Sequence, residues 1–169
     1  VDANDPAFSN PTKPVGKFFS ETDAADMAAK TGWFFAEDSG RGWRRMVASP
    51  KPKKILDLKT IDALLDAGVI PIACGGGGVP VLHGDNGHWT GVAAVIDKDL
   101  TSAMLAAHLH ADALIMLTGV EQVALDFNKP TQRPLDHMTL AQAKENEHNL
   151  KYKADTMLNY KFNKSSNVK

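Results

Sequence analysis

VIPIACGGGGVP, residues 69–80, joins a continuous apolar run to four consecutive glycines. An apolar run without polar alternation is typical of a β-strand that is covered on both faces, as in a parallel sheet. Pro71 counts against a central strand, because proline lacks a backbone donor. The glycines let the backbone approach a ligand closely and offer N–H groups to an anion. The stretch therefore predicts a buried strand that ends in an anion-binding loop, with a flexible connector as the plainer alternative.

The residues on either side of this stretch alternate between helical and strand patterns. Ile61, Leu64 and Leu65 recur at the spacing of one helical face. Three further segments have the composition of strands: Val92–Ile96, Ala113–Leu117 and Val120–Phe127. Between the first two, Leu100–Ala107 has the spacing of one helical face. This alternation predicts an α/β fold built in layers around a largely parallel sheet. We expect three runs to be buried strands of that one sheet: Val69–Cys74, Val92–Ile96 and Ala113–Leu117.

The first fifty residues are rich in turn formers, with prolines at positions 6, 11 and 14. Asp23–Lys30 predicts a short helix that Gly32 closes. Trp33–Ala36 and Trp43–Val47 predict two short strands around a turn. Three arginines around Trp43 favour an exposed charged hairpin over a phosphate or base contact. The segment SPKPKK that follows predicts a connector, because proline disfavours both helix and central strand.

Length and composition restrict the class of protein. The chain has 169 residues, about the length of one domain. Its formal net charge is −1, whereas a dedicated nucleic-acid binder carries a basic excess, so we expect no nucleic-acid partner. No apolar run approaches the ~18–20 residues of a membrane span, and the N-terminus has no signal-peptide pattern. The single cysteine, Cys74, fits a reducing compartment and predicts a cytoplasmic protein. We expect Cys74 to be a small buried hydrophobe, not a nucleophile.

A second polar motif, Asp97-Lys98-Asp99, comes between an apolar segment and a predicted helix. Two carboxylates and an ammonium group beside a helix N-terminus could hold a metal–phosphate group, because the helix dipole adds positive potential there. The alternative is that Asp97 or Asp99 only caps the helix. Together with the glycine run, the motif favours phosphoryl chemistry.

Six segments of the chain resemble carbamate kinase, a member of the amino-acid-kinase superfamily. They occur in the family's order from the N-terminus to about Lys144, and they are Asn10–Phe19, Glu37–Pro52, Ala73–Val81, Gly91–Ala106, Ala111–Val123 and Phe127–Thr139. Other branches of the superfamily, such as acylglutamate or uridylate kinases, fit less well, because the first two segments resemble the subdomain of carbamate kinase in particular.

The resemblance implies the carboxyl-terminal part of a three-layer αβα sandwich with a small protruding subdomain. It implies a segment over residues 1–9, the protruding subdomain over residues 10–52 and the nucleotide-binding α/β domain over residues 53–144. Residues 145–169 are rich in Asn and Lys and predict a solvated helix or a frayed tail. The resemblance also implies a homodimer for the intact parent protein.

The resemblance further implies reversible phosphoryl transfer between ATP and carbamate, with Mg²⁺ bound through the nucleotide, and a use in arginine catabolism. Lys13 resembles the subdomain lysine that reaches carbamoyl phosphate, Lys98 a lysine on the transferred group, and Asp99 the aspartate that orients them. The implied phosphate and nucleotide contacts are Gly75, Gly76, Gly77, Gly78, Asp97, Thr118, Gly119 and Val120.

Both ends of the chain depart from the family pattern. The family's amino-terminal Gly-Gly-Asn motif does not occur here, and no GSMGPK-type segment follows Lys144. We therefore expect a fragment of such a kinase. In such a fragment, part of the sheet edge and one helix layer should be uncovered. The alternative function is an inactive fragment that keeps only nucleotide binding or oligomerisation.

Overall fold

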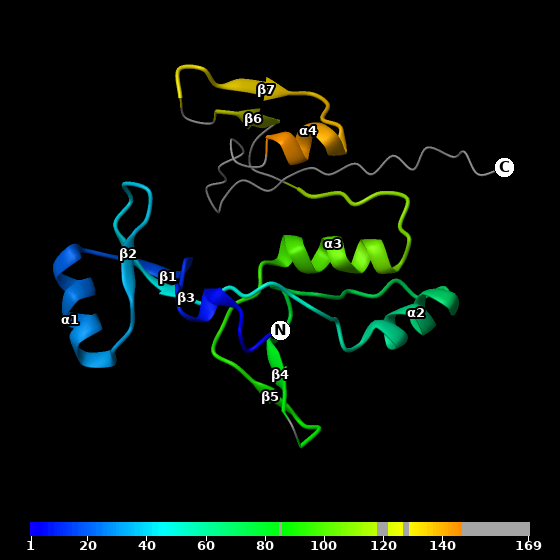
Figure 1. The fold of residues 1–169 in the computed structure, drawn as a ribbon, viewed down its shortest axis with the longest axis horizontal. Coiled ribbons are helices and arrows are strands. Elements are labelled where there is room, and N and C mark those ends of the chain that lie inside the picture. Colours follow the sequence, from blue (N-terminus) through cyan, green and yellow to red (C-terminus); the bar gives the residue numbers. More distant parts are fainter. Residues whose placement is uncertain (85, 118–121, 127–128, 147–169) are drawn as a thin grey trace. The chain divides into compact units, whose positions relative to one another are not determined.

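The computed structural model describes residues 1–84, 86–117, 122–126 and 129–146 (Figure 1). Its helices are α1 (Glu21–Thr31), α2 (Leu58–Asp66), α3 (Lys98–His108) and α4 (Leu140–Glu145). Its strands are β1 (Lys13–Phe19), β2 (Phe35–Glu37), β3 (Trp43–Val47), β4 (Val81–His83), β5 (Trp89–Gly91), β6 (Val123–Leu125) and β7 (Arg133–Leu135).

The mixture of helices and strands confirms the α/β class. Packing divides the chain into two compact units, Val1–Leu105 and Ala106–Lys169. The predicted domain boundaries at residues 9, 52 and 144 stay a prediction. None of the helices in the described ranges is long and apolar enough to cross a membrane.

A three-stranded antiparallel sheet in the order β1-β3-β2 organises the beginning of the chain. The predicted strand Trp43–Val47 is confirmed as β3, while β2 lies slightly later than the predicted Trp33–Ala36. The strand β1 did not follow from the sequence pattern, because Pro14 argues against a strand. Pro14 is accommodated since β1 is at the edge of the sheet, where a missing donor faces no neighbour.

Helix α1 packs against all three strands of this sheet. The Ser20 hydroxyl caps it by accepting a hydrogen bond from the backbone N–H of Asp23 at 3.1 Å. Gly32 ends it in the left-handed conformation, as the sequence predicts, and donates to the carbonyl of Ala28. The buried side chains here are Ala24 and Phe35, and the ring of Phe35 meets Phe19 edge to face at 5.4 Å.

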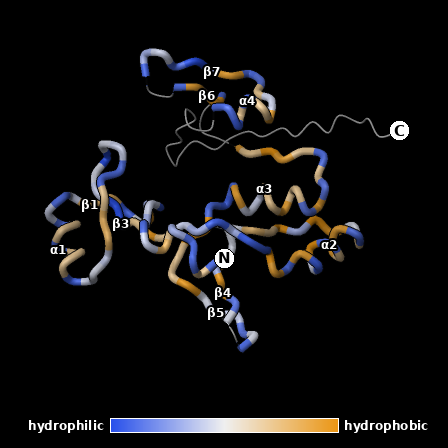
Figure 2. The backbone as a smooth tube through the Cα atoms, in the orientation of Figure 1, coloured by the Kyte–Doolittle hydropathy of each residue, from blue (hydrophilic) through white to orange (hydrophobic). Residues whose placement is uncertain are grey.

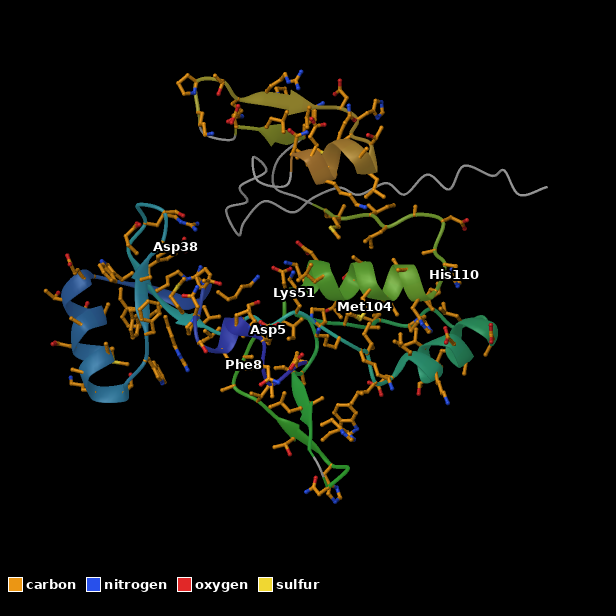
Figure 3. The ribbon with its side chains drawn as sticks, in the orientation of Figure 1. Asp5, Phe8, Asp38, Lys51, Met104 and His110 are labelled. Atoms are coloured by element: carbon orange, nitrogen blue, oxygen red, sulfur yellow. The ribbon has the colours of Figure 1, made fainter. Side chains whose placement is uncertain are left out.

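The charged hairpin between β2 and β3 uses its arginines internally. The carboxylate of Asp38 accepts hydrogen bonds from Arg41 and Arg44 at 3.3 and 3.2 Å (Figure 3). Burial of Asp38 alone would raise its pKa, but hydrogen bonds from Ser39 and the two arginines outweigh it and lower the pKa. The guanidinium of Arg45 stacks on the Trp33 ring at 3.7 Å. The arginines thus hold the turn together.

Hydrogen bonds to the backbone link this sheet to the rest of the first unit. Asp5 accepts hydrogen bonds from the backbone N–H groups of Ala7 and Lys51, which fastens the N-terminal turn to the predicted connector (Figure 3). Just before the connector, the carbonyl of Ala48 accepts from the N–H of Val95 at 2.9 Å. This bond brings the end of β3 beside the segment that leads into α3.

The prediction of three buried strands in one parallel sheet is wrong for the described residues. Val69–Cys74, Val92–Ile96 and Ala113–Leu117 are not β-strands, and the described strand pairs are all antiparallel. Val92 and Val95 each donate one isolated hydrogen bond, to Pro80 and Ala48. The physical reason is that a β-strand exists only through a neighbouring ladder, and apolar composition does not supply one.

Two short hairpins complete the described strands. β4 and β5 pair around the turn that the Asp-Asn-Gly sequence predicts, although Asp85 itself lies outside the described residues. In the second unit, β6 pairs with β7 and takes up the middle of the predicted strand Val120–Phe127. There α4 begins at a capping box in which Thr139 and Gln142 exchange hydrogen bonds. Most of the predicted polar tail lies outside the described residues.

The core of the β1-β3-β2 sheet yields a stability prediction. Phe35 is 8% exposed and Phe34, its neighbour in the chain, is 55% exposed. Phe35→Ala should lower the free energy of unfolding by about 3 kcal/mol, because it leaves a cavity beside Phe19 and α1. Phe34→Ala, the matched control, should change it by less than about 0.5 kcal/mol. Urea unfolding followed by circular dichroism measures both, and equal losses would contradict this account of the core.

Candidate functional site

The glycine run forms a tight turn whose backbone conformation requires glycine. The N–H of Gly77 donates to the carbonyl of Cys74 at 2.7 Å and closes the turn. Gly77 and Gly78 have positive φ angles of 118° and 87°. A Cβ atom on Gly77 would lie 2.2 Å from the carbonyl oxygen of Ile96, so only glycine permits this approach. The turn is therefore a defined structure and not a flexible connector.

The close approach places the turn against the start of α3. The hydroxyl of Thr101 donates to the carbonyl of Gly77 at 2.9 Å. Thr101 is 4% exposed, and Ile96 is buried to the same degree. The burial of Ile96 is as the sequence predicts, whereas the sequence pattern does not single out Thr101. A threonine among apolar positions of a predicted helix was the available signal, because a buried hydroxyl needs a partner.

Asp97 caps α3 with one carboxylate oxygen and binds a lysine with the other. Its Oδ1 accepts the backbone N–H of Asp99 at 3.0 Å. Its Oδ2 accepts from the Nζ of Lys13 at 2.8 Å, although 84 residues separate the two in the chain. Both side chains are partly buried, with 25% of Lys13 and 35% of Asp97 exposed. The helix cap by Asp97, one of the two alternatives from the sequence, is thus present. The sequence did not predict the contact between Asp97 and Lys13.

The backbone route to this ion pair runs through the three-stranded sheet. Lys13 is the first residue of β1 and pairs with Val47 at the end of β3. The next residue, Ala48, holds the N–H of Val95, two residues before Asp97. The sheet register therefore delivers the lysine to the start of α3.

Electrostatic contacts keep Asp97 ionised. Burial alone would raise its pKa, but the hydrogen bond from Lys13, the N–H of Asp99 and the charge of Lys98 together lower the pKa below its usual value. Lys98 lies at the first position of α3, 46% exposed, with its Nζ 3.9 Å from the Oδ1 of Asp99. Two ammonium groups thus stand at one helix N-terminus.

The first unit therefore brings together most of the sequence-predicted site residues: Lys13, Gly75, Gly76, Gly77, Gly78, Asp97, Lys98 and Asp99. Thr118, Gly119 and Val120 lie outside the described residues. Lysine ammonium groups, glycine N–H groups and a helix N-terminus are the donors that bind phosphate oxygens.

Two further features concern metals and thiols. In the described parts of the chain, no three His, Cys, Asp or Glu side chains gather as a metal site would require. The free thiol of Cys74 is partly buried, and this burial raises its pKa, so the thiol form is favoured.

Comparisons with known proteins agree on one family. The sequence pattern of the amino acid kinase family matches residues 17–162. The chain is 50% identical over 142 residues to the carbamate kinase-like protein YahI of Escherichia coli K12, covering 83% of this chain and 45% of that protein. It is 49% identical over 140 residues to the carbamate kinase of Clostridium perfringens, covering 83% of this chain and 44% of that protein.

Solved structures match in the same way. Carbamate kinase from Giardia lamblia bound to citric acid superposes with a TM-score of 0.78 and 42% identity, over 88% of this chain and 46% of that one. The same enzyme bound to AMP-PNP gives a TM-score of 0.70 and 44% identity, over 88% and 47%. The chain spans less than half the length of the relatives that it matches.

The glycine turn gives the first prediction for this site. Gly77→Ala should destabilise the fold by about 2 kcal/mol or more, because the new Cβ would collide with the Ile96 carbonyl in a strained conformation. Gly76→Ala is the matched control, since nothing lies within 4 Å of a Cβ there. Comparing their urea midpoints measures the effect, and a Gly77→Ala midpoint equal to that of Gly76→Ala would refute the close approach.

The lowered pKa of Asp97 gives the second prediction for this site. A lowered carboxylate pKa stabilises the folded state above the ordinary aspartate value of about 3.9, and this stabilisation is lost as the pH falls through the folded value. Asp97→Asn should therefore lower the Tm at neutral pH and make it less sensitive to acid below about pH 5. Asp26→Asn, on an exposed position of α1, serves as the control. The assignment fails if both variants keep the acid sensitivity of the wild type.

Proposed function

Because this chain belongs to the amino acid kinase family, we propose that it is the phosphate-binding part of a carbamate kinase, which transfers a phosphoryl group between carbamoyl phosphate and ADP. The observation that carries the proposal is the 2.8 Å contact between Lys13 and Asp97. It puts the lysine of β1 beside the glycine turn and the N-terminus of α3. The names of the relatives support this choice of reaction within the family.

In this proposal, the chain acts by positioning and by charge. Phosphoryl transfer requires little covalent help from a protein, and it is accelerated by positive groups around the transferred oxygens. Lys98 contacts the transferred group, and the N–H groups of Gly75, Gly76 and Gly78 bind phosphate oxygens, while the N–H of Gly77 closes the turn. Lys13 binds carbamoyl phosphate, and Asp99 orients the ammonium groups.

Asp97 gives Lys13 a resting partner in this scheme. An incoming phosphate competes with the Asp97 carboxylate for the ammonium group of Lys13, which is already held at the site by the sheet. The direct Asp97–phosphate contact expected from the resemblance is unfavourable between two anions, and a bridging lysine resolves it. Asp97 therefore serves the phosphate through Lys13.

ATP and ADP are the proposed nucleotides, with Thr118, Gly119 and Val120 in their pocket. The glycine N–H groups and lysines suit nucleotide phosphates, while Mg²⁺ comes bound to those phosphates. When bound, Mg²⁺ neutralises negative charge on the β- and γ-phosphate oxygens. A cytoplasmic setting, a role in arginine catabolism and a homodimeric parent protein belong to the same proposal.

An inactive fragment that keeps nucleotide binding or oligomerisation is the second candidate. The match to less than half of each relative favours it, because the remaining half is not represented in this chain. A coupled assay of ATP formation from ADP and carbamoyl phosphate separates the two. Turnover above the blank supports the kinase, and none from the folded chain supports the fragment.

Lysine variants test the proposed roles in that assay. Lys98→Ala should lower kcat on the order of 10²-fold, because it removes a charge from the transferred group. Lys13→Ala should mainly raise the KM for carbamoyl phosphate, since its charge acts on that substrate. Lys17→Ala, an exposed position of the same strand β1, should leave both constants unchanged. Wild-type turnover in Lys98→Ala would remove Lys98 from the mechanism.

A further inference from the structure

The burial of Thr101 on helix α3 is not explained by hydropathy. Thr101 is 4% exposed, whereas Leu100, the residue before it, is 45% exposed. Figure 2 shows that α3 begins in hydrophilic residues and continues in a mixture of hydrophilic and hydrophobic ones. The helix therefore buries a hydroxyl and leaves an apolar side chain in solvent, the reverse of the usual order. A buried hydroxyl costs free energy unless it is hydrogen-bonded, so its partner identifies what the threonine does.

The hydroxyl proton of Thr101 goes to the glycine turn and not to its own helix. Its Oγ1 lies 2.9 Å from the carbonyl oxygen of Gly77 and 3.4 Å from the carbonyl oxygen of Asp97. The Asp97 carbonyl already accepts the backbone N–H of Thr101 at 3.2 Å, as in a helical turn. Because a hydroxyl has one proton to donate, the shorter contact takes it. The side chain thus joins α3 to the carbonyl of Gly77.

The peptide unit between Gly77 and Gly78 depends on this bond for its orientation. Glycine adopts backbone angles of either sign at little cost, and both residues that flank the unit are glycines, with φ angles of 118° and 87°. No side chain on either residue opposes rotation of the peptide plane. The hydrogen bond from Thr101 does oppose it, because rotation would carry the Gly77 carbonyl away from the hydroxyl and leave a buried acceptor without a partner.

The other end of the same peptide unit is an open donor. A trans peptide is planar, with its C=O and N–H groups pointing in opposite directions, and none of the described peptide bonds is cis. Because the Gly77 carbonyl points at the buried hydroxyl of Thr101, the N–H of Gly78 points away from it. Gly77 is buried and Gly78 is exposed, and none of the described residues accepts a hydrogen bond from the N–H of Gly78. One buried hydroxyl therefore holds this open donor in a fixed direction.

We propose that Thr101 is a positioning residue of the phosphate site, whose hydroxyl holds the Gly77 carbonyl and so aims the N–H of Gly78 at the anion. This inference rests on the proposed function, which supplies the anion, a phosphate group of ADP or ATP. Thr101 itself touches no phosphate, because its buried hydroxyl is already bound to Gly77. A donor that is oriented in advance needs no reorganisation when the anion binds, whereas a freely rotating peptide must first be ordered.

The orientation of the peptide is measured first, without any ligand. In an isotope-labelled chain, the residual dipolar coupling of the Gly78 amide reports the direction of its N–H bond. Thr101→Val removes the hydroxyl but keeps the shape of the side chain, and it should change this coupling. Thr101→Ala, which puts no methyl group beside the Gly77 carbonyl, should give the same change. Thr101→Ser keeps the hydroxyl and should leave the coupling at its wild-type value.

Binding of inorganic pyrophosphate is then followed by the chemical shifts of the glycine amides. Thr101→Val should bind pyrophosphate about 10- to 100-fold more weakly than the wild type, the factor that corresponds to one hydrogen bond to a charged group. The Gly78 amide should stop responding, while the amides of Gly75 and Gly76 still shift, a selectivity that a general loss of stability would not produce. Thr101→Ser should bind within about threefold of the wild type. Thr31→Val, which removes a hydroxyl bound to a helix carbonyl on exposed α1, is the matched control and should not change the affinity.

Three results would overturn the proposal, and they separate it from the proposed function. A Gly78 coupling that is unchanged in Thr101→Val, in a chain that still binds pyrophosphate, removes the role of Thr101 and leaves the proposed function standing. Equal losses of affinity in Thr101→Val and Thr101→Ser would show that the hydroxyl is not the cause. A wild-type chain that binds no pyrophosphate contradicts the proposed function, and the role of Thr101 at a phosphate site fails with it.

Discussion

The contact between Gly77 and the backbone of Ile96 is the constraint on which the candidate site depends. A side chain at position 77 would need the space that the Ile96 carbonyl already occupies, so the turn can meet α3 only through glycine. Thr101 then secures the contact with a buried hydrogen bond. These contacts hold the glycine turn at the N-terminus of α3, where the helix dipole adds positive potential.

The three-stranded sheet adds a charge to this region from a distant part of the chain. Its register, continued by the bond between Val95 and Ala48, carries Lys13 to Asp97. The carboxylate of Asp97 serves two structures at once, since one oxygen caps α3 and the other holds the lysine. An edge strand with a proline in it thus contributes to the candidate site, and a local pattern search overlooks such a strand.

The exposed residues Ile70 and Ile72 and the candidate site share the glycine turn as a boundary. On one side of the turn, Thr101 and Ile96 are buried. On the other, Ile70 and Ile72 are exposed and their backbone is unpaired with the described residues. A well-packed turn therefore adjoins a surface with the composition of a core.

The sequence by itself determined the local features: the helix closed by Gly32, the strand Trp43–Val47, the Asp-Asn-Gly hairpin and the motifs around Gly75 and Lys98. These depend on neighbours in the chain, and local sterics and capping decide them. The tertiary structure alone decided that Lys13 meets Asp97 and that Thr101 binds Gly77. It also decided that residues 70–73 have no backbone hydrogen-bond partner among the described residues. Such outcomes depend on which distant segment supplies a partner. An apolar pattern indicates that a segment needs a partner, but it does not indicate which segment that is.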